Sequence, residues 1–205
     1  MNEFLSGLKE LRKSAQKRNF EQSVDLVINL KDFDVKKQSI NTSIVLPFQI
    51  KESKICAFLE KDDGAFDFVV KKDEIARYKP EQIKKLASEY DFFVSLASLM
   101  PAVATAFGRI LGPLGKMPNP KVGCVMMDER NANETVQKLK KTIVLRTKDA
   151  SIKTSVGKEN MPDEQLIQNA SAVYNTILNS LPNRKENIRS VMLKLTMSKP
   201  VKVKI

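Results

Sequence analysis

The chain has 205 residues, enough for one or two domains with a buried core, and its formal net charge is +11. This basic balance favours an acidic partner, of which nucleic acid is the first candidate. The lack of His excludes imidazole catalysis and most zinc sites, and Cys56 and Cys124 lack metal-ligand spacing, so we expect reduced thiols and neither metal nor cofactor. We also expect a soluble intracellular protein that does not contact membranes, because no apolar run is evident that could act as a signal or span a bilayer.

The first 49 residues predict one helix and two strands. Apolar residues recur at helical spacing among lysines and arginines, as in a basic amphipathic helix: Phe4, Leu8, Leu11 and Ala15. Apolar and polar residues then alternate from 24 to 30, which predicts a strand with one buried face, and a second strand is expected near 41–47.

Strands alternate with helices from residue 50 to residue 140, a pattern typical of a small α/β domain with a mostly parallel sheet. After a polar linker at 49–54, the expected strands are 55–59, 66–70 and 91–96. The expected helices begin at Pro80, which suits a first turn, at Ser98, and at Asn131, which with Glu134 resembles a capping box.

Sheet-forming segments return after residue 141. Strands at 142–148 and 151–156 are expected to form a hairpin around Lys148-Asp149-Ala150, and a long helix is expected between Pro162 and Pro182. The next strand alternates, with Val191, Leu193, Leu195 and Met197 expected on one face and Ser190, Met192, Lys194 and Thr196 on the other. Together the two ends predict a discontinuous outer domain, residues 1–49 and 141–205, around an inserted domain of residues 50–140.

The segment from Gly108 to Gly123 holds four of the chain's seven glycines and three of its prolines. Glycine permits positive φ and proline removes a backbone donor, so we expect a long shaped loop and no helix. The residues alone leave open a packed crossover of the α/β domain or a functional loop, but the spacing fits no phosphate-binding motif. The residues concerned are Gly108, Arg109, Gly112, Pro113, Gly115, Lys116, Met117, Pro118, Asn119, Pro120, Lys121 and Gly123.

This segment resembles the signature of the L-one family of large-subunit ribosomal proteins, and the resemblance extends well beyond it. It implies an α/β protein of two domains, in which a Rossmann-like three-layer domain is inserted into a split β-α-β, RNA-recognition-like domain. It also implies binding to the rRNA of the mobile stalk, influence on release of deacylated tRNA from the exit site, and repression of its own mRNA. We expect a free monomer without enzymatic activity, of archaeal type from Lys116-Met117.

The positive charge is concentrated in the expected outer domain. Residues 1–49 have a balance of +2, residues 50–140 of +2 and residues 141–205 of +7. Affinity for phosphate should therefore be concentrated in the outer domain. Lys194, Lys202 and Lys204 either contribute to it or only solubilise the outer face of the sheet.

In the family, RNA contacts centre on the first strand and on a Thr-Met-Gly turn near the C-terminus. The residues that match these contacts are Phe20, Ser23, Asp25, Ser190, Thr196, Met197 and Ser198. Hydroxyls pair with ribose or phosphate, and apolar side chains cover sugar or base. The alternative is that Phe20 packs in the core and the two strand serines are ordinary solvent-facing residues.

Three positions depart from the family pattern. Ser198 replaces the usual Gly, so either the turn keeps a negative φ or a hydroxyl lies close to the RNA. Phe48-Gln49 replaces His-Gly after Leu46-Pro47, which predicts a less flexible first hinge. Asn19 stands where bacterial relatives have Lys, which weakens one phosphate contact.

The alternative function is a Rossmann-type nucleotide-binding enzyme whose Gly/Pro segment grips phosphate. The missing phosphate-loop spacing and the lack of a catalytic constellation disfavour it. We instead expect the segment to position the inserted domain and to aim Lys116 and Lys121 at a defined surface that contacts tRNA.

Overall fold

The computed structural model describes residues 2–16, 18–34, 40–61, 64–128, 132–147 and 149–203. The chain forms two compact units, one of Met1–Lys51 with Ile143–Ile205 and one of Glu52–Thr142. We call them the outer unit and the inserted unit. Three residues used in the predictions lie outside the described residues: Asn131, Lys148 and Lys204.

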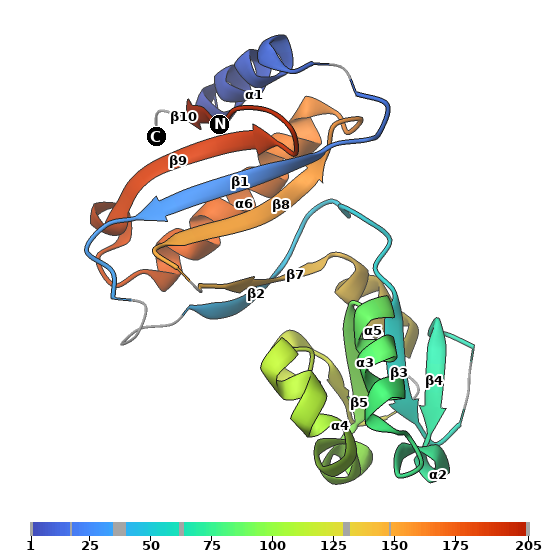
Figure 1. The fold of residues 1–205 in the computed structure, drawn as a ribbon. Coiled ribbons are helices and arrows are strands. Elements are labelled where there is room, and N and C mark those ends of the chain that lie inside the picture. The colour runs from blue at the N-terminus through green and yellow to red at the C-terminus, as the bar shows by residue number, and fades with distance from the viewer. Residues whose placement is uncertain are drawn as a thin grey trace. The chain divides into compact units, whose positions relative to one another are not determined.

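The outer unit is built on a four-stranded antiparallel sheet with the order β10-β9-β1-β8 (Figure 1). Its strands are β1 (Ser23–Leu30), β8 (Ser151–Lys158), β9 (Ile188–Leu195) and β10 (Val201–Val203). Helices α1 (Asn2–Ser14) and α6 (Asp163–Ser180) pack against one face of the sheet and share its core. The other face carries no helix among the described elements.

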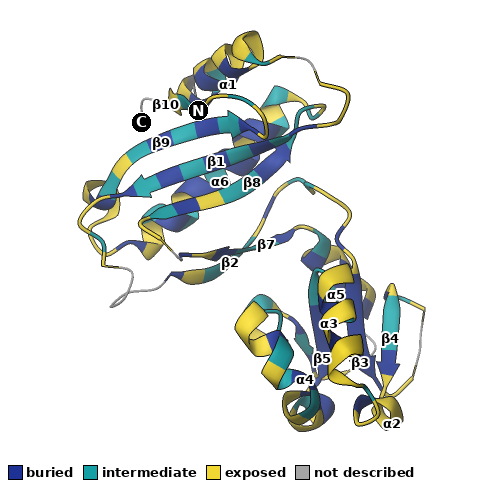
Figure 2. Ribbon diagram, in the orientation of Figure 1, coloured by how far each residue is buried: buried dark blue, intermediate teal, exposed yellow. Residues whose placement is uncertain are grey.

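Alternation along the strands accounts for this one-sided packing. Every second residue of β1 from Val24 to Leu30 is buried against the helices, as the sequence predicted (Figure 2). The long helix expected between Pro162 and Pro182 is α6, and the apolar residues on one side of it are likewise buried, from Leu166 to Leu181. Because the period of a strand is two, the intervening residues all lie on the uncovered face.

The predicted hairpin of residues 142–156 is wrong. Strand β7 (Thr142–Arg146) pairs with β2 (Asn41–Val45) in a separate two-stranded sheet, whereas β8 pairs with β1. The reason is long-range hydrogen bonding: the Ile40 amide donates to Thr147 Oγ1 (2.8 Å), and the Leu30 amide donates to the carbonyl of Ala150 (2.9 Å). The turn thus passes the chain from one sheet to another.

The inserted unit contains a parallel sheet with the order β4-β3-β5-β6, which confirms the predicted α/β class. Its strands are β3 (Ile55–Leu59), β4 (Phe68–Lys71), β5 (Phe92–Leu96) and β6 (Val125–Met126). Its α-helices are α2 (Lys72–Ile75), α3 (Pro80–Glu89), α4 (Met100–Leu114) and α5 (Ala132–Lys140), and short 3₁₀ helices occupy Ala97–Leu99 and Pro120–Val122. Strand β3 is buried along its whole length, as a central parallel strand requires.

One expectation about apolar stretches was wrong. By length and composition alone, Ala97–Leu114 could cross a membrane. Four of its side chains, Leu99, Val103, Phe107 and Leu111, are buried in the core of the inserted unit. A core helix of a water-soluble domain has the same length and composition, so this stretch is weak grounds for a membrane span.

The segment after Pro47 is fastened to the outer unit by Asn169, a fully buried residue of α6. Asn169 Oδ1 accepts from the Phe48 amide (3.1 Å), and Nδ2 donates to the carbonyls of Phe48 (3.1 Å) and Val156 (2.9 Å). All these groups are therefore satisfied inside the unit. This role of Asn169 could not be predicted, because a polar residue beside the apolar residues of a helix is expected to face solvent.

Candidate nucleic-acid interface

The uncovered face of the four-stranded sheet presents polar side chains in rows that cross the strands. In the first row Asp25 of β1 lies between Ser155 of β8 and Lys194 of β9. The next two rows hold Lys153, Val27, Met192 and Lys202, then Ser151, Asn29 and Ser190. Asn29 Nδ2 donates to Ser190 Oγ (3.0 Å), so the strands are also joined through their side chains.

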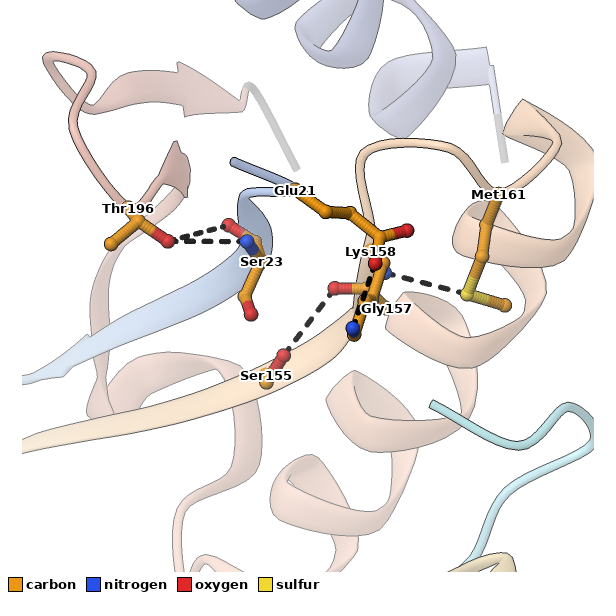
Figure 3. Close-up of polar contacts among 7 residues, drawn as sticks. All are labelled: Glu21, Ser23, Ser155, Gly157, Lys158, Met161 and Thr196. Atoms are coloured by element: carbon orange, nitrogen blue, oxygen red, sulfur yellow. Dashed lines mark hydrogen bonds and ion pairs between the residues drawn. The ribbon is translucent and has the colours of Figure 1, made fainter. Parts of the chain in front are cut away.

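A tight turn after β9 closes one end of this face. Thr196 is fixed to the start of β1, because its Oγ1 accepts from the Ser23 amide (3.1 Å) (Figure 3). The Thr196 amide also donates to the Ser23 carbonyl (3.2 Å). Ser198 Oγ accepts from the Leu195 amide (2.9 Å), and the Ser198 amide donates to the Leu195 carbonyl (3.1 Å). The turn is thus held by hydroxyl groups on both sides.

The conformation of Ser198 shows whether the turn needs the positive φ that the family's usual glycine would allow. Among the described residues the only non-glycine residues with positive φ are Asp32 and Arg184, so Ser198 keeps a negative φ. Its hydroxyl is bonded within the turn and also donates to the Lys199 carbonyl (3.1 Å). We conclude that serine stabilises the turn locally.

Gln22 is buried and holds the turn by a side-chain hydrogen bond, a role that was not predicted from the sequence. Gln22 Oε1 accepts from the Met197 amide (3.2 Å), and its Nε2 donates to Glu159 (3.3 Å). Beside it, Lys158 Nζ forms an ion pair with Glu21 at 2.7 Å (Figure 3). A lone glutamine before a strand carries no periodic signal, which is why this residue could not be predicted.

Two large apolar side chains stand exposed near this end. Phe20 is 52% exposed and Met197 is 61% exposed, so neither packs in the core. The predicted strand included Met197 on the same face as Leu195, which was wrong because β9 ends at Leu195. An exposed aromatic ring and a thioether beside hydroxyls and backbone amides provide stacking surface together with hydrogen-bonding groups.

Asp25 is the acidic residue of this face. Partial burial raises the pKa of its carboxyl above the ordinary value, and the Lys194 charge and a hydrogen bond from Ser155 oppose that shift. At neutral pH the carboxylate is an acceptor, suited to a ribose hydroxyl and unsuited to phosphate. Lys194 next to it supplies the positive charge.

The structure therefore brings most of the predicted contact residues together. Ser23, Thr196, Met197 and Ser198 meet at one end of the sheet, with Phe20 three residues before β1. Asp25 and Lys194 form the adjacent row. Ser190 does not join them, because it lies at the far end of β9 beside Asn29.

Comparison with known proteins decides the family. The model of the ribosomal protein L1p/L10e family matches residues 11–199. The chain belongs to the ribosomal protein L1p/L10e family. It is 37% identical to the large ribosomal subunit protein uL1 of Thermococcus kodakarensis over 97% of this chain and 95% of that protein. It is 38% identical to the uL1 protein of Pyrococcus horikoshii (97% and 94% covered) and 36% identical to that of Nanoarchaeum equitans (93% and 95% covered). These archaeal relatives agree with the predicted archaeal type.

The Gly/Pro segment of this family member differs from the predicted loop. Helix α4 continues through Gly108, Arg109, Gly112 and Pro113 before it ends at Leu114. Pro113 is exposed and lies one residue before the end of the helix, so the amide that it lacks removes only one hydrogen bond, in the last turn. A β-carbon at Gly108 or Gly112 would meet nothing within 4 Å, so neither glycine is required by packing inside this chain.

The segment becomes irregular only at Gly115, whose left-handed conformation (φ 63°) ends the helix. The Gly115 amide donates to Gly112 (2.8 Å) and the Lys116 amide to Leu111 (2.9 Å), the pair of bonds typical of a glycine-terminated helix. Farther on, extended Asn119 accepts from the Lys121 amide (2.9 Å) and starts a 3₁₀ turn that ends at Gly123, also left-handed (φ 83°). Around it Pro118 is buried and Met117 packs partly against the core.

Lys116 does not have the orientation expected from the sequence. Its Nζ donates to the carbonyls of Ala87 and Tyr90, both at 2.7 Å, at the C-terminal end of α3. A positive charge there satisfies terminal carbonyls and complements the helix dipole. Lys121, in contrast, is exposed. Of the two lysines of the segment, only Lys121 extends to the surface.

Proposed function

We propose that this protein is a constituent of the large ribosomal subunit in the cytoplasm and binds the rRNA of the mobile stalk directly. The observation that carries the proposal is the pair of exposed side chains, Phe20 and Met197, beside the bonded turn of Thr196 and Ser23. Two large exposed apolar side chains at one end of the sheet, next to ordered polar groups, suit contact with RNA bases and sugars. The uL1 names of the relatives assign the same assembly to those proteins.

The chemistry of this end of the sheet suits RNA. RNA bases and sugars pack against the apolar side chains. The ribose 2′-hydroxyl donates to the Asp25 carboxylate and bonds to polar groups of the turn. Lys194 supplies positive charge near the same end, whereas Lys158 is paired with Glu21. Base stacking on an aromatic ring contributes about 1–3 kcal/mol per base to affinity and tolerates any base, so specificity must come from the hydrogen-bonding groups.

The test measures affinity for a labelled stalk rRNA fragment by fluorescence anisotropy. Phe20→Ala and Met197→Ala should each weaken binding about 5-fold to 150-fold, the range that corresponds to 1–3 kcal/mol. The matched control is Met127→Ala, since Met127 is 88% exposed and lies in the inserted unit. Equal losses from Met127→Ala and Met197→Ala would contradict the proposal, as would unchanged affinity in both test variants.

The proposal extends to two further RNA partners. A mimic of the rRNA site in the protein's own mRNA would occupy the same face, so an mRNA leader that binds should compete with the stalk fragment. Release of deacylated tRNA from the exit site involves the inserted unit through exposed Lys121. Lys121→Gln should then alter tRNA release on assembled ribosomes and leave affinity for the isolated stalk fragment within about twofold.

The enzyme alternative has lost its main support. The segment that was to grip phosphate is a helix end whose lysine is bonded to carbonyl groups. Among the described residues, no group of three or more Cys, Asp or Glu is placed to hold a metal ion. Calorimetry with mononucleotides separates the alternatives, because saturable micromolar binding would favour the enzyme. Light scattering of the free protein should give the mass of a monomer.

A further inference from the structure

The outer unit contains a basic cavity away from the Thr196 turn, and only Ser190 of the matched RNA contacts lines it. Its volume is about 320 Å³, and it opens at the beginning of β9, the end of the strand away from Thr196. Its lining includes Tyr174, Lys185, Arg189, Ser190 and Lys202. Three of these residues are cationic, and no carboxylate is among the residues that line it. A cavity of this size holds a small anionic group.

The cations come from a turn that the fold holds firmly. Lys185 lies in the 3₁₀ helix Arg184–Asn187, and Arg189 follows it in β9. Asn187 is 2% exposed and is bonded on both sides: its Oδ1 accepts from the Asn183 amide (2.9 Å), and its Nδ2 donates to the Lys31 carbonyl (3.1 Å). The turn is therefore an ordered part of the outer unit.

The backbone here is also unusual. Asp32 and Arg184 are the two non-glycine residues with positive φ in the described chain, at 52° and 46°. Both adjoin segments bonded to Asn187. Strained backbone of this kind persists where the surrounding structure fixes it, and it occurs often at binding sites.

The polar groups of the cavity are available to a ligand. Within the described chain, neither Lys185, Arg189 nor Lys202 forms an ion pair, and all three are exposed. The Ser190 hydroxyl accepts from Asn29 and has no acceptor of its own among the described residues. Two acidic residues come near these groups: Glu186 lies between Lys185 and Arg189 in the chain, and the charge of Glu3 acts on the Tyr174 hydroxyl.

We propose that this cavity binds a phosphate group of the RNA backbone, as a second anchoring point on the outer unit. Arg189 suits the bidentate geometry of phosphate, and Lys185 and Lys202 add point charges. Six residues of extended strand separate Ser190 from Thr196, a span of about 20 Å. An RNA that contacts the Thr196 turn and crosses the sheet reaches the cavity several nucleotides away. This inference rests on the proposed function.

The first experiment uses the double variant Arg189→Gln with Lys202→Gln in the full chain. Binding of the stalk rRNA fragment is measured by anisotropy from 50 to 400 mM KCl. A lost phosphate contact lowers the slope of log K against log salt by about 0.7–0.9. The control, Lys84→Gln with Lys85→Gln, removes the same charge from exposed positions of α3. We expect the slope to fall in the cavity variant and to stay nearly constant in the control; equal slopes in both would overturn the proposal.

The second experiment titrates inorganic phosphate into the protein without RNA and follows amide resonances by NMR. We expect saturable shifts at Ser190, Val191 and Val203, and their loss in the double variant. Shifts that do not saturate would contradict the site. Saturable shifts with an unchanged RNA salt slope would show a site for free phosphate and contradict the RNA assignment. If phosphate saturates the cavity but the wild-type protein does not bind the stalk fragment, the proposed function fails and the RNA anchor with it.

Discussion

Replacement of Lys116 by Met should destabilise the inserted unit and leave RNA binding unchanged. The Lys116 ammonium is bonded to two carbonyls at the end of α3, those of Ala87 and Tyr90. Methionine keeps the apolar stem of the side chain and removes both hydrogen bonds and the charge. The Ala87 carbonyl is then left without this partner at the end of the helix.

The structure sets the magnitude. A hydrogen bond to a charged group contributes about 1.5–3 kcal/mol, and a cation near a helix C-terminus adds about 0.3–1 kcal/mol. Lys116 is half-buried and water can replace part of the interaction, so the two bonds do not count in full. We expect a loss of about 2 kcal/mol. In a domain of about 90 residues this lowers the melting temperature by roughly 8–16 °C.

Native-state hydrogen exchange is the appropriate assay, because the two units need not unfold together. Core amides of α3 and β5 should lose about 2 kcal/mol of protection, and those of β1 and β9 should lose none. Lys121→Met, at an exposed position, is the control and should change protection by less than about 0.5 kcal/mol. Equal effects of the two changes, or a loss of affinity for stalk RNA in Lys116→Met alone, would refute the assignment of Lys116 as a helix cap.

Three further changes test other parts of the account. Gly108→Ala and Gly112→Ala should each stabilise the free protein by about 0.5–1 kcal/mol in thermal unfolding, because a β-carbon has open space at both helical positions; destabilisation would show that the helix cannot accept it. Asp25→Asn should raise the free energy of unfolding at pH 7. The pKa of the Asp25 carboxyl is higher in the folded protein than in the unfolded chain, so the wild-type protein loses stability as the pH rises above the ordinary pKa of 3.8, and the asparagine variant does not. A steeper loss of stability with rising pH in the variant than in the wild type would contradict this prediction. Burial raises the pKa of Cys56 to about 12 and that of Cys124 to about 11, so neither thiol should react with iodoacetamide at pH 8 until the chain is unfolded, as mass spectrometry would detect.

The regular parts of the fold could be predicted because local patterns determine them. The alternation of β1 and the stripe of α6 reflect burial on one side, which any extended or helical segment over a core must show. The apolar run of β3 likewise indicated a strand, and the structure shows it buried along its whole length. These patterns predicted which residues are buried without any knowledge of the partner strands.

The errors concern tertiary context. Lys148-Asp149-Ala150 has turn residues, yet distant bonds from Ile40 and Leu30 send the two strands into different sheets. Likewise, Gly108 to Pro113 contain helix-breaking residues, but the buried stripe that ends at Leu111 keeps this stretch helical. In both cases packing outweighed local propensity.

The candidate site was predictable only in part. The side chains on β1 and β9 follow from strand period, and the resemblance supplied Thr196 and Met197. Gln22 and Asn169, which hold the turn and the first hinge, became evident only from their hydrogen bonds. Contacts between residues far apart in the chain leave no pattern in a single sequence.

The most direct test of the central claim is RNA binding by the outer unit alone. Residues 1–51 joined to residues 143–205 by a short Gly/Ser linker keep the sheet, both helices and the Thr196 turn. The account predicts that this protein binds the stalk rRNA fragment with an affinity within about tenfold of the full chain and depends on Phe20 in the same way. A folded circular-dichroism spectrum without specific binding would contradict it.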